Sequence, residues 1–110
     1  MDLSNNFRGA FKIDFNKKKH DALFTMNALR LLLKNEKIDL KDFDSWVSSD
    51  PLTAVPLIAY YSVVNSCVYS KKKFSADKEF FIAEILDSGQ IDMISEAIAD
   101  AMSSEEAGKK

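Results

Sequence analysis

An uncharged stretch in the middle of the chain constrains the fold more than any other feature. No Asp, Glu, Lys or Arg occurs between Pro51 and Ser70, and an apolar helix of about 20 residues is long enough to cross a lipid bilayer. Pro56 and Asn65 interrupt its apolar character, however, and strongly amphipathic segments flank it on both sides. We therefore predict a central helix that is buried on all sides in a water-soluble domain, and no membrane span.

Composition sets the size class and argues against two kinds of partner. With 110 residues, of which 46% are hydrophobic and 29% charged, the chain has the size of one domain with a substantial core. Its 15 basic and 17 acidic residues nearly balance, so no overall positive charge favours nucleic acid or an anionic membrane. Cys67 is the only cysteine, which excludes an internal disulfide and fits a reducing cytoplasm. The N-terminus lacks the basic and apolar regions of a signal peptide.

Apolar periodicity predicts a short strand before the helices. Phe11, Ile13 and Phe15 alternate with charged residues, which is the period of a half-buried strand. A single strand needs a partner, so we expect a second extended piece close by, or one from another chain in a homo-oligomer. The polar residues 16–20 predict a turn.

Five helical segments follow in the predicted order. Apolar residues recur at helical spacing in residues 22–35, 40–48, 56–69, 76–88 and 91–102. Asp39 and Ser75 are the predicted N-caps of the second and fourth segments. Because a proline inside a helix removes a backbone hydrogen bond, we predict a turn over residues 50–55 and a central helix that begins at Pro56, with one kinked helix as the alternative. Gly89 suits the left-handed position after a helix end.

The predicted fold class is therefore mainly α. It is a small helical bundle of about five helical segments with a short N-terminal β-strand or hairpin. Residues 9–102 form the single helical domain, between a flexible N-terminus at residues 1–8 and a flexible C-terminal tail at residues 103–110.

Two helical segments carry a clear apolar face. In the first segment, the face consists of Ala22, Met26, Leu29 and Leu33, and Leu23, Leu31 and Leu32 widen it. In the last segment, the stripe of Ile91, Ile94, Ile98 and Ala101 lies opposite Asp92, Glu96 and Asp100. The three carboxylates form either a solvated acidic surface or a docking strip for a basic partner.

The sequence predicts no catalytic residues, no cofactor and no metal site. A zinc site needs about four ligands, whereas His20 is the only histidine and Cys67 lies in an apolar segment without a base beside it. No Gly-x-Ser-x-Gly turn and no glycine-rich phosphate loop occurs. We therefore do not expect an enzyme.

Two lysine triplets, residues 17–19 and 71–73, raise the question of nucleic-acid binding. Lysines can contact phosphates, but reading a base sequence needs Arg, Asn or Gln along a recognition helix. The chain has only two arginines, Arg8 and Arg30. We interpret the triplets as soluble turns and expect no nucleic-acid partner.

Aromatic residues leave two interpretations open. They make up 11% of this small domain, and they either fill the core or remain partly exposed as anchors for another protein. The second interpretation favours a protein-binding surface.

The order of the motifs resembles the tail assembly chaperones of long-tailed bacteriophages that infect Gram-positive bacteria. In these proteins a strand leads into a helix with an F-x-x-x-A-L-R core, here Phe24, Ala28, Leu29 and Arg30. An uncharged I-x-Y-Y helix follows, here Ile58, Tyr60 and Tyr61, and an amphipathic helix ends the domain. The resemblance covers about residues 10–102.

The resemblance implies a non-catalytic protein in the cytoplasm of the infected host that is absent from the mature virion. Such a protein binds the tape measure protein, keeps it soluble and helps to recruit tail tube subunits around it. In many of these phages a programmed ribosomal frameshift adds a C-terminal extension. A purine-rich slippery sequence is compatible with Gly108-Lys109-Lys110.

The predicted partner contacts are large aromatic side chains, together with the isoleucine face of the last helix if the core does not use that face. They are Trp46, Tyr60, Tyr61, Tyr69, Ile91, Ile94 and Ile98. Two other functions stay open as alternatives: a small DNA-binding regulator or adaptor with a helix-turn-helix, and a structural head–tail joining protein of the virion.

Overall fold

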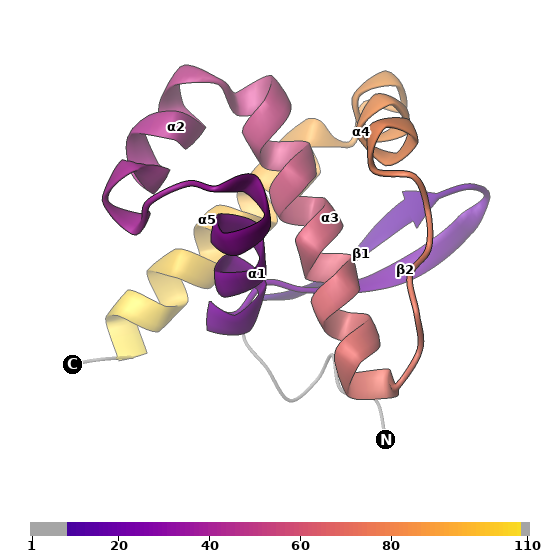
Figure 1. Cartoon of the computed structure of the whole chain (residues 1–110), viewed down its shortest axis with the longest axis horizontal. Coiled ribbons are helices and arrows are strands. Elements are labelled where there is room, and N and C mark those ends of the chain that lie inside the picture. Colours follow the sequence, from indigo (N-terminus) through magenta and orange to yellow (C-terminus); the bar gives the residue numbers. More distant parts are fainter. Residues whose placement is uncertain (1–8, 109–110) are drawn as a thin grey trace.

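The computed structural model describes the backbone of residues 9–108 and the side chains of residues 9–102 (Figure 1). The predicted flexible N-terminus, residues 1–8, and the last two residues of the predicted tail, 109–110, lie outside the described residues. Within the described range the chain forms one β-hairpin followed by five α-helices. This arrangement confirms the predicted fold class.

The hairpin consists of β1 (Ala10–Phe15) and β2 (Lys18–Leu23), which pair antiparallel. Asn16 and Lys17 connect them with φ angles of 53° and 64°, and a two-residue turn with positive φ at both positions matches the twist of paired strands. Ile13 is buried as the alternation predicts. The partner strand that β1 requires is therefore supplied by the same chain.

The second strand shortens two predicted elements. The turn predicted over residues 16–20 comprises only Asn16 and Lys17, because two residues are enough to reverse the chain. The first helix does not begin at Ala22, because residues 18–23 pair with β1. Instead, α1 (Met26–Glu36) follows Thr25, and it ends where Lys37 adopts the left-handed conformation.

The second predicted helical segment has two parts. A 3₁₀ turn, η2 (Leu40–Asp42), leads directly into α2 (Phe43–Ser49). Phe43 is buried in the core. The prediction that Asp39 caps this segment is wrong, since its side chain makes no capping hydrogen bond.

The central helix α3 (Pro51–Ser70) is continuous, so the predicted start at Pro56 is wrong and the alternative of one helix is correct. Pro51 lies in the first turn, where a missing N–H has no consequence. Pro56 removes one further hydrogen bond, which the Leu52 carbonyl would have accepted. Leu52 lies in the exposed first turn of the helix, where water can replace that bond.

The fourth helix has a different cap from the predicted one. Helix α4 (Lys78–Asp87) follows Asp77, whose Oδ2 accepts a hydrogen bond from the Phe80 backbone N–H at 2.9 Å. Asp77, and not Ser75, therefore satisfies the first turn of the helix.

The last helix is longer than its apolar stripe suggests. Gly89 has a φ of 76°, which confirms the predicted left-handed residue between the two helices. Helix α5 (Ile91–Gly108) then continues beyond the predicted end at Met102. The segment predicted as a tail is therefore helical in its backbone as far as Gly108.

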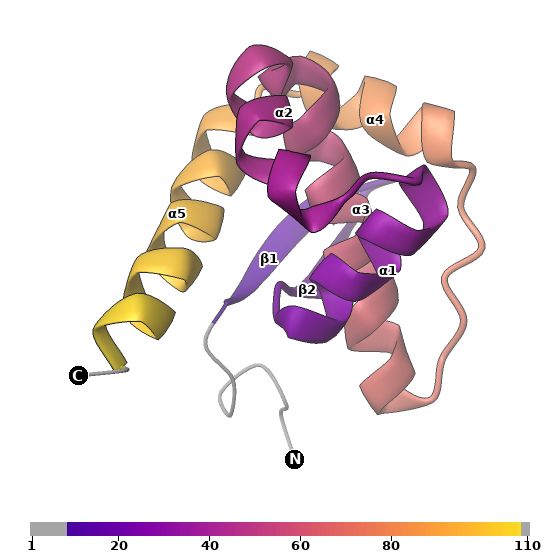
Figure 2. The same ribbon diagram turned by 60° about the vertical axis from the view of Figure 1, so that its left-hand side comes forward.

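All other elements are arranged around α3. Strand β2 and helices α1, α2, α4 and α5 pack against it; α5 passes behind α3 in Figure 1 and runs along the left-hand side of the molecule in Figure 2. Among the described residues, α3 is the one helix long and apolar enough to cross a membrane, and 56% of its most apolar window is buried inside the fold. Its lack of charge thus matches its position at the centre of the core.

Candidate protein-binding groove

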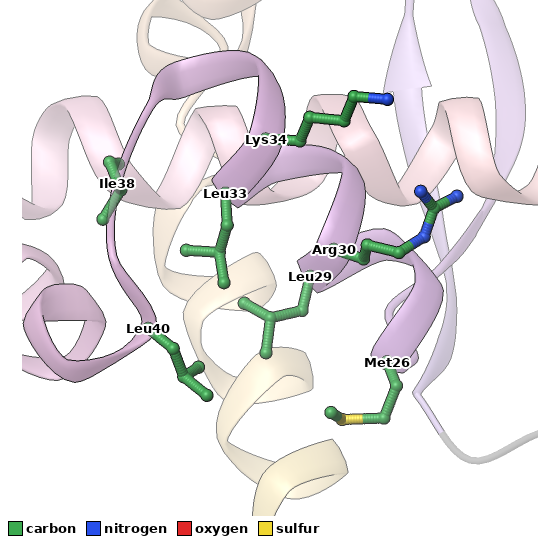
Figure 3. Close-up of a pocket in the computed structure, with 7 residues that line it drawn as sticks. All are labelled: Met26, Leu29, Arg30, Leu33, Lys34, Ile38 and Leu40. Carbon is green, nitrogen blue, oxygen red and sulfur yellow. The ribbon is translucent and has the colours of Figure 1, made fainter.

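An apolar groove of about 400 Å³ opens beside α1. Its walls consist of side chains from α1, from the loop that follows it and from η2, namely Met26, Leu29, Arg30, Leu33, Lys34, Ile38 and Leu40. Figure 3 shows Leu29, Leu33 and Leu40 pointing toward the side on which α5 passes, whereas Arg30 and Lys34 extend along the other edge.

The groove exists because α1 has two apolar faces. Ala28 and Leu32 are buried in the core. Met26, Leu29 and Leu33 follow the i, i+3, i+7 spacing of a second stripe and line the groove. Met26 is 62% exposed, so this stripe leaves apolar surface in contact with water.

A buried amide fixes the rotation of α1 about its axis. Asn65 of α3 is fully buried, and its Nδ2 donates hydrogen bonds to the Leu23 carbonyl at 2.9 Å and to Thr25 Oγ1 at 3.0 Å. Its Oδ1 accepts a hydrogen bond from Asn27 Nδ2 at 2.7 Å. The end of β2, the residue before α1 and the first turn of α1 are thereby tied to one side chain of the central helix, which holds the outer stripe away from the core.

A second polar cluster holds the other end of α1. Glu36 Oε2 accepts hydrogen bonds from the Tyr61 hydroxyl and from Lys78 Nζ, each at 2.7 Å. Burial raises the pKa of Glu36, but the hydrogen bonds from Lys78 and Tyr61 and the charge of Lys78 outweigh it, so the pKa lies below its ordinary value. Burial and the adjacent Glu36 carboxylate raise the pKa of Tyr61 to about 12. Lys78 carries a raised pKa, because it donates its hydrogen bond to Glu36.

The charged side chains that line the groove are both positive. Arg30 and Lys34 are one helical turn apart on α1, and within residues 9–102 no carboxylate lines the groove. Arg30 Nε donates a hydrogen bond to Asn27 Oδ1 at 3.0 Å, which connects it to the Asn65 cluster. Within the described part of the chain neither cation forms an ion pair. The groove therefore combines an apolar wall with an uncompensated cationic edge.

The side chains that sequence analysis considered for metal binding or nucleophilic chemistry lie apart from one another or in apolar surroundings. Among residues whose side chains are described, no three His, Cys, Asp or Glu groups are placed to hold a metal ion. The His20 ring packs against Phe15 and Phe74, and its Nε2 lies 3.1 Å from the Phe15 carbonyl. Burial raises the pKa of the Cys67 thiol, which disfavours the reactive thiolate at neutral pH.

Three of the seven predicted partner contacts lie in the core. Tyr61, Ile94 and Ile98 are 5%, 0% and 7% exposed. Tyr61 is held by the Glu36 cluster, and the two isoleucines belong to the same core as α3. These three side chains therefore offer little surface to a partner, because the domain itself buries them.

The other four predicted contacts keep some exposed surface but do not form the groove. Tyr69 is exposed near the end of α3, whereas Trp46, Tyr60 and Ile91 are half-buried against the core. Tyr60 packs edge-on against Tyr61 and Phe81. None of the four is among the groove residues.

Sequence reasoning recognised the outer stripe of α1 as an apolar face but did not assign it to a partner. It missed Ile38 and Leu40 entirely. Two features of the sequence could have indicated the groove. Helix α1 carries more apolar positions than the buried Ala28 and Leu32 require, and Leu40 lies between two charged residues. Such surplus apolar positions indicate a surface that the domain does not bury itself.

Comparison with protein-family models, with curated proteins and with solved structures finds no match to this chain.

Proposed function

We propose that this protein is a non-catalytic binding module whose groove beside α1 receives an apolar helical segment of another polypeptide. The observation that carries the proposal is the outward stripe of Met26, Leu29 and Leu33, which continues into Leu40 across an open groove. An amphipathic partner helix can lay its own apolar face against a groove wall of this kind.

The exposed surface of Met26 and Leu40 supplies only part of the free energy that binding at one groove needs. Full burial of a large apolar side chain contributes about 1.5–3 kcal/mol. Met26 and Leu40 are 62% and 63% exposed, so covering both contributes on the order of 2–4 kcal/mol. Association costs about 4–15 kcal/mol because the two molecules lose translational and rotational freedom. Burial of the half-exposed surface of Leu29, Leu33 and Ile38 must therefore supply much of the favourable free energy that is still needed. Such a module suits a long partner that several copies cover together.

On the sequence resemblance, we further propose that the partner is a phage tape measure protein and that the module is a tail assembly chaperone. In this role it acts in the cytoplasm of the infected host, keeps apolar helical stripes of the tape measure protein from aggregating and helps to recruit tail tube subunits. The outward stripe of α1 supports this proposal, because it offers the apolar surface that such stripes require.

Co-expression of the full chain with the tape measure protein tests this function. Leu40→Asp places a charge in the groove at an exposed position, and Leu52→Asp is the matched control, because Leu52 is 60% exposed and lies outside the groove. We expect Leu40→Asp to reduce the soluble, co-purifying partner by about tenfold or more, and Leu52→Asp to leave it unchanged. Equal recovery with both variants would contradict the groove as the binding site. Recovery of the protein in purified virions would favour the head–tail joining alternative.

A further inference from the structure

We propose that the segment bound in the groove is an amphipathic helix that carries acidic side chains along one edge of its apolar stripe. This inference rests on the proposed function and adds the chemical class of the partner. Its basis is the charge of the groove: Arg30 and Lys34 are the charged lining residues among those whose side chains the structure describes.

The position of the two cations defines where the acidic residues belong. Arg30 and Lys34 are four residues apart, or about 6 Å along the helix axis. They lie beside the stripe of Met26, Leu29 and Leu33, which spans about 10 Å. A helix packed along α1 therefore meets the apolar stripe along its middle and both cations at one edge. Figure 3 shows Arg30 and Lys34 together at that edge. Carboxylates spaced three or four residues apart on that helix match the two cations.

The cations are available for such a partner. Arg30 is held by a hydrogen bond from its Nε to Asn27, which leaves the rest of the guanidinium free for a carboxylate. Neither Arg30 nor Lys34 pairs with an acidic group of the described residues. A basic partner helix would instead bring like charges together at the groove edge, which disfavours its binding.

Two synthetic peptides of about 15 residues test the partner class. Both are amphipathic helices with the same leucine stripe, and one has Glu and the other Lys at the positions that flank it. Binding to the full-length protein is measured by fluorescence anisotropy at low and high salt. We expect the Glu peptide to bind about threefold to tenfold more tightly than the Lys peptide at low salt, with a smaller difference at high salt.

Charge reversal assigns this preference to the groove. The double variant Arg30→Glu/Lys34→Glu should bind the Lys peptide more tightly than the Glu peptide. The control is Lys72→Glu/Lys73→Glu, which changes the net charge by the same amount at exposed positions outside the groove. We expect this control to keep the preference for the Glu peptide.

The possible failures are distinguishable. Equal binding of both peptides, lost in Leu40→Asp but insensitive to charge reversal, would overturn the acidic partner and keep the binding groove. Absence of binding by either peptide would overturn the groove function and this inference together. A dimer of the unmodified protein that Arg30→Glu/Lys34→Glu converts to a monomer would overturn the inference as well, because it would show that the groove receives a second copy of this chain.

Discussion

Asn27 Nδ2 donates a hydrogen bond of 2.7 Å to Oδ1 of the fully buried Asn65. This contact joins the first turn of α1 to the middle of the central helix. Together with the bonds from Asn65 to Leu23 and Thr25, it determines which face of α1 meets the core. The groove is therefore a consequence of a polar contact inside the domain.

Replacing Asn65 should destabilise the domain strongly. Asn65→Leu keeps the branching of the side chain but leaves buried partners, including the Leu23 carbonyl, without their hydrogen bonds, and each such loss costs about 1–3 kcal/mol. We expect a decrease of about 2–5 kcal/mol in the free energy of unfolding in urea. A change below about 1 kcal/mol would show that α1 is positioned without this amide.

The two faces of α1 should respond differently to substitution. Leu32 is fully buried, so Leu32→Ala should reduce the free energy of unfolding by about 2–5 kcal/mol. Met26 is 62% exposed, and Met26→Ala should change it by less than about 0.5 kcal/mol. Chemical denaturation of both variants checks this contrast. The reverse order of effects would mean that α1 packs with its other face inward.

Two glycines with positive φ provide a further matched pair. A Cβ at Gly9 would lie 2.1 Å from the Phe24 carbonyl oxygen, whereas a Cβ at Gly89 would meet nothing within 4 Å. Gly89→Ala should therefore reduce stability only by the conformational strain of about 1–2 kcal/mol. Gly9→Ala adds a clash between the new Cβ and the Phe24 carbonyl oxygen, at a place where a backbone hydrogen bond from Phe24 to Gly9 holds the two segments together. The melting temperature of Gly9→Ala should therefore be lower than that of Gly89→Ala. Equal melting temperatures would contradict the close approach at Gly9.

The Glu36 cluster should make stability depend on acid. Because the pKa of folded Glu36 lies below its ordinary value of 4.5, the ionised group stabilises the fold above that value, and the contribution is lost as the pH falls through the folded pKa. Glu36→Gln should lower the urea midpoint at neutral pH and lose less stability than the wild type on acidification to about pH 3. The same acid sensitivity in both proteins would assign it to other carboxylates.

Tyr61 should titrate late at alkaline pH. Its pKa is raised from 10.0 to about 12, so the neutral hydroxyl stabilises the fold below pH 10, and this contribution is lost as the pH rises toward 12. An absorbance titration of the phenolates should show a late component that disappears in Tyr61→Phe. A titration curve unchanged by Tyr61→Phe would contradict the burial of the hydroxyl beside Glu36.

Much of the fold follows from local patterns in the sequence. The alternation of Phe11, Ile13 and Phe15 predicts a strand, and the absence of charge from Pro51 to Ser70 predicts the central helix. The strand prediction depends on the alternation of neighbouring residues, and the prediction of the central helix depends on the burial of an uncharged segment. The extent of α3 was less predictable, because the loss of one hydrogen bond at Pro56 is outweighed by packing around the whole helix.

The candidate site was harder to predict, because it depends on long-range contacts. Helical spacing identifies the stripe of Met26, Leu29 and Leu33, but it does not say whether the stripe faces the core or solvent. The bond between Asn27 and Asn65 decides this, and 38 positions of the sequence separate the two residues. The sequence predicts Tyr61 as a partner contact for the same reason, since its hydrogen bond to Glu36 is not visible in the sequence around either residue.

A methyl NMR titration tests the binding groove in the intact chain. The probe is the leucine-striped peptide with flanking Glu residues, and the signals are the methyl groups of Met, Leu, Ile and Val. We predict shifts that concentrate on Met26, Leu29, Leu33, Ile38 and Leu40, with little change at the exposed Leu52 and Val68. Saturating shifts at Leu52 or Val68 with none at the groove residues would contradict a binding surface beside α1.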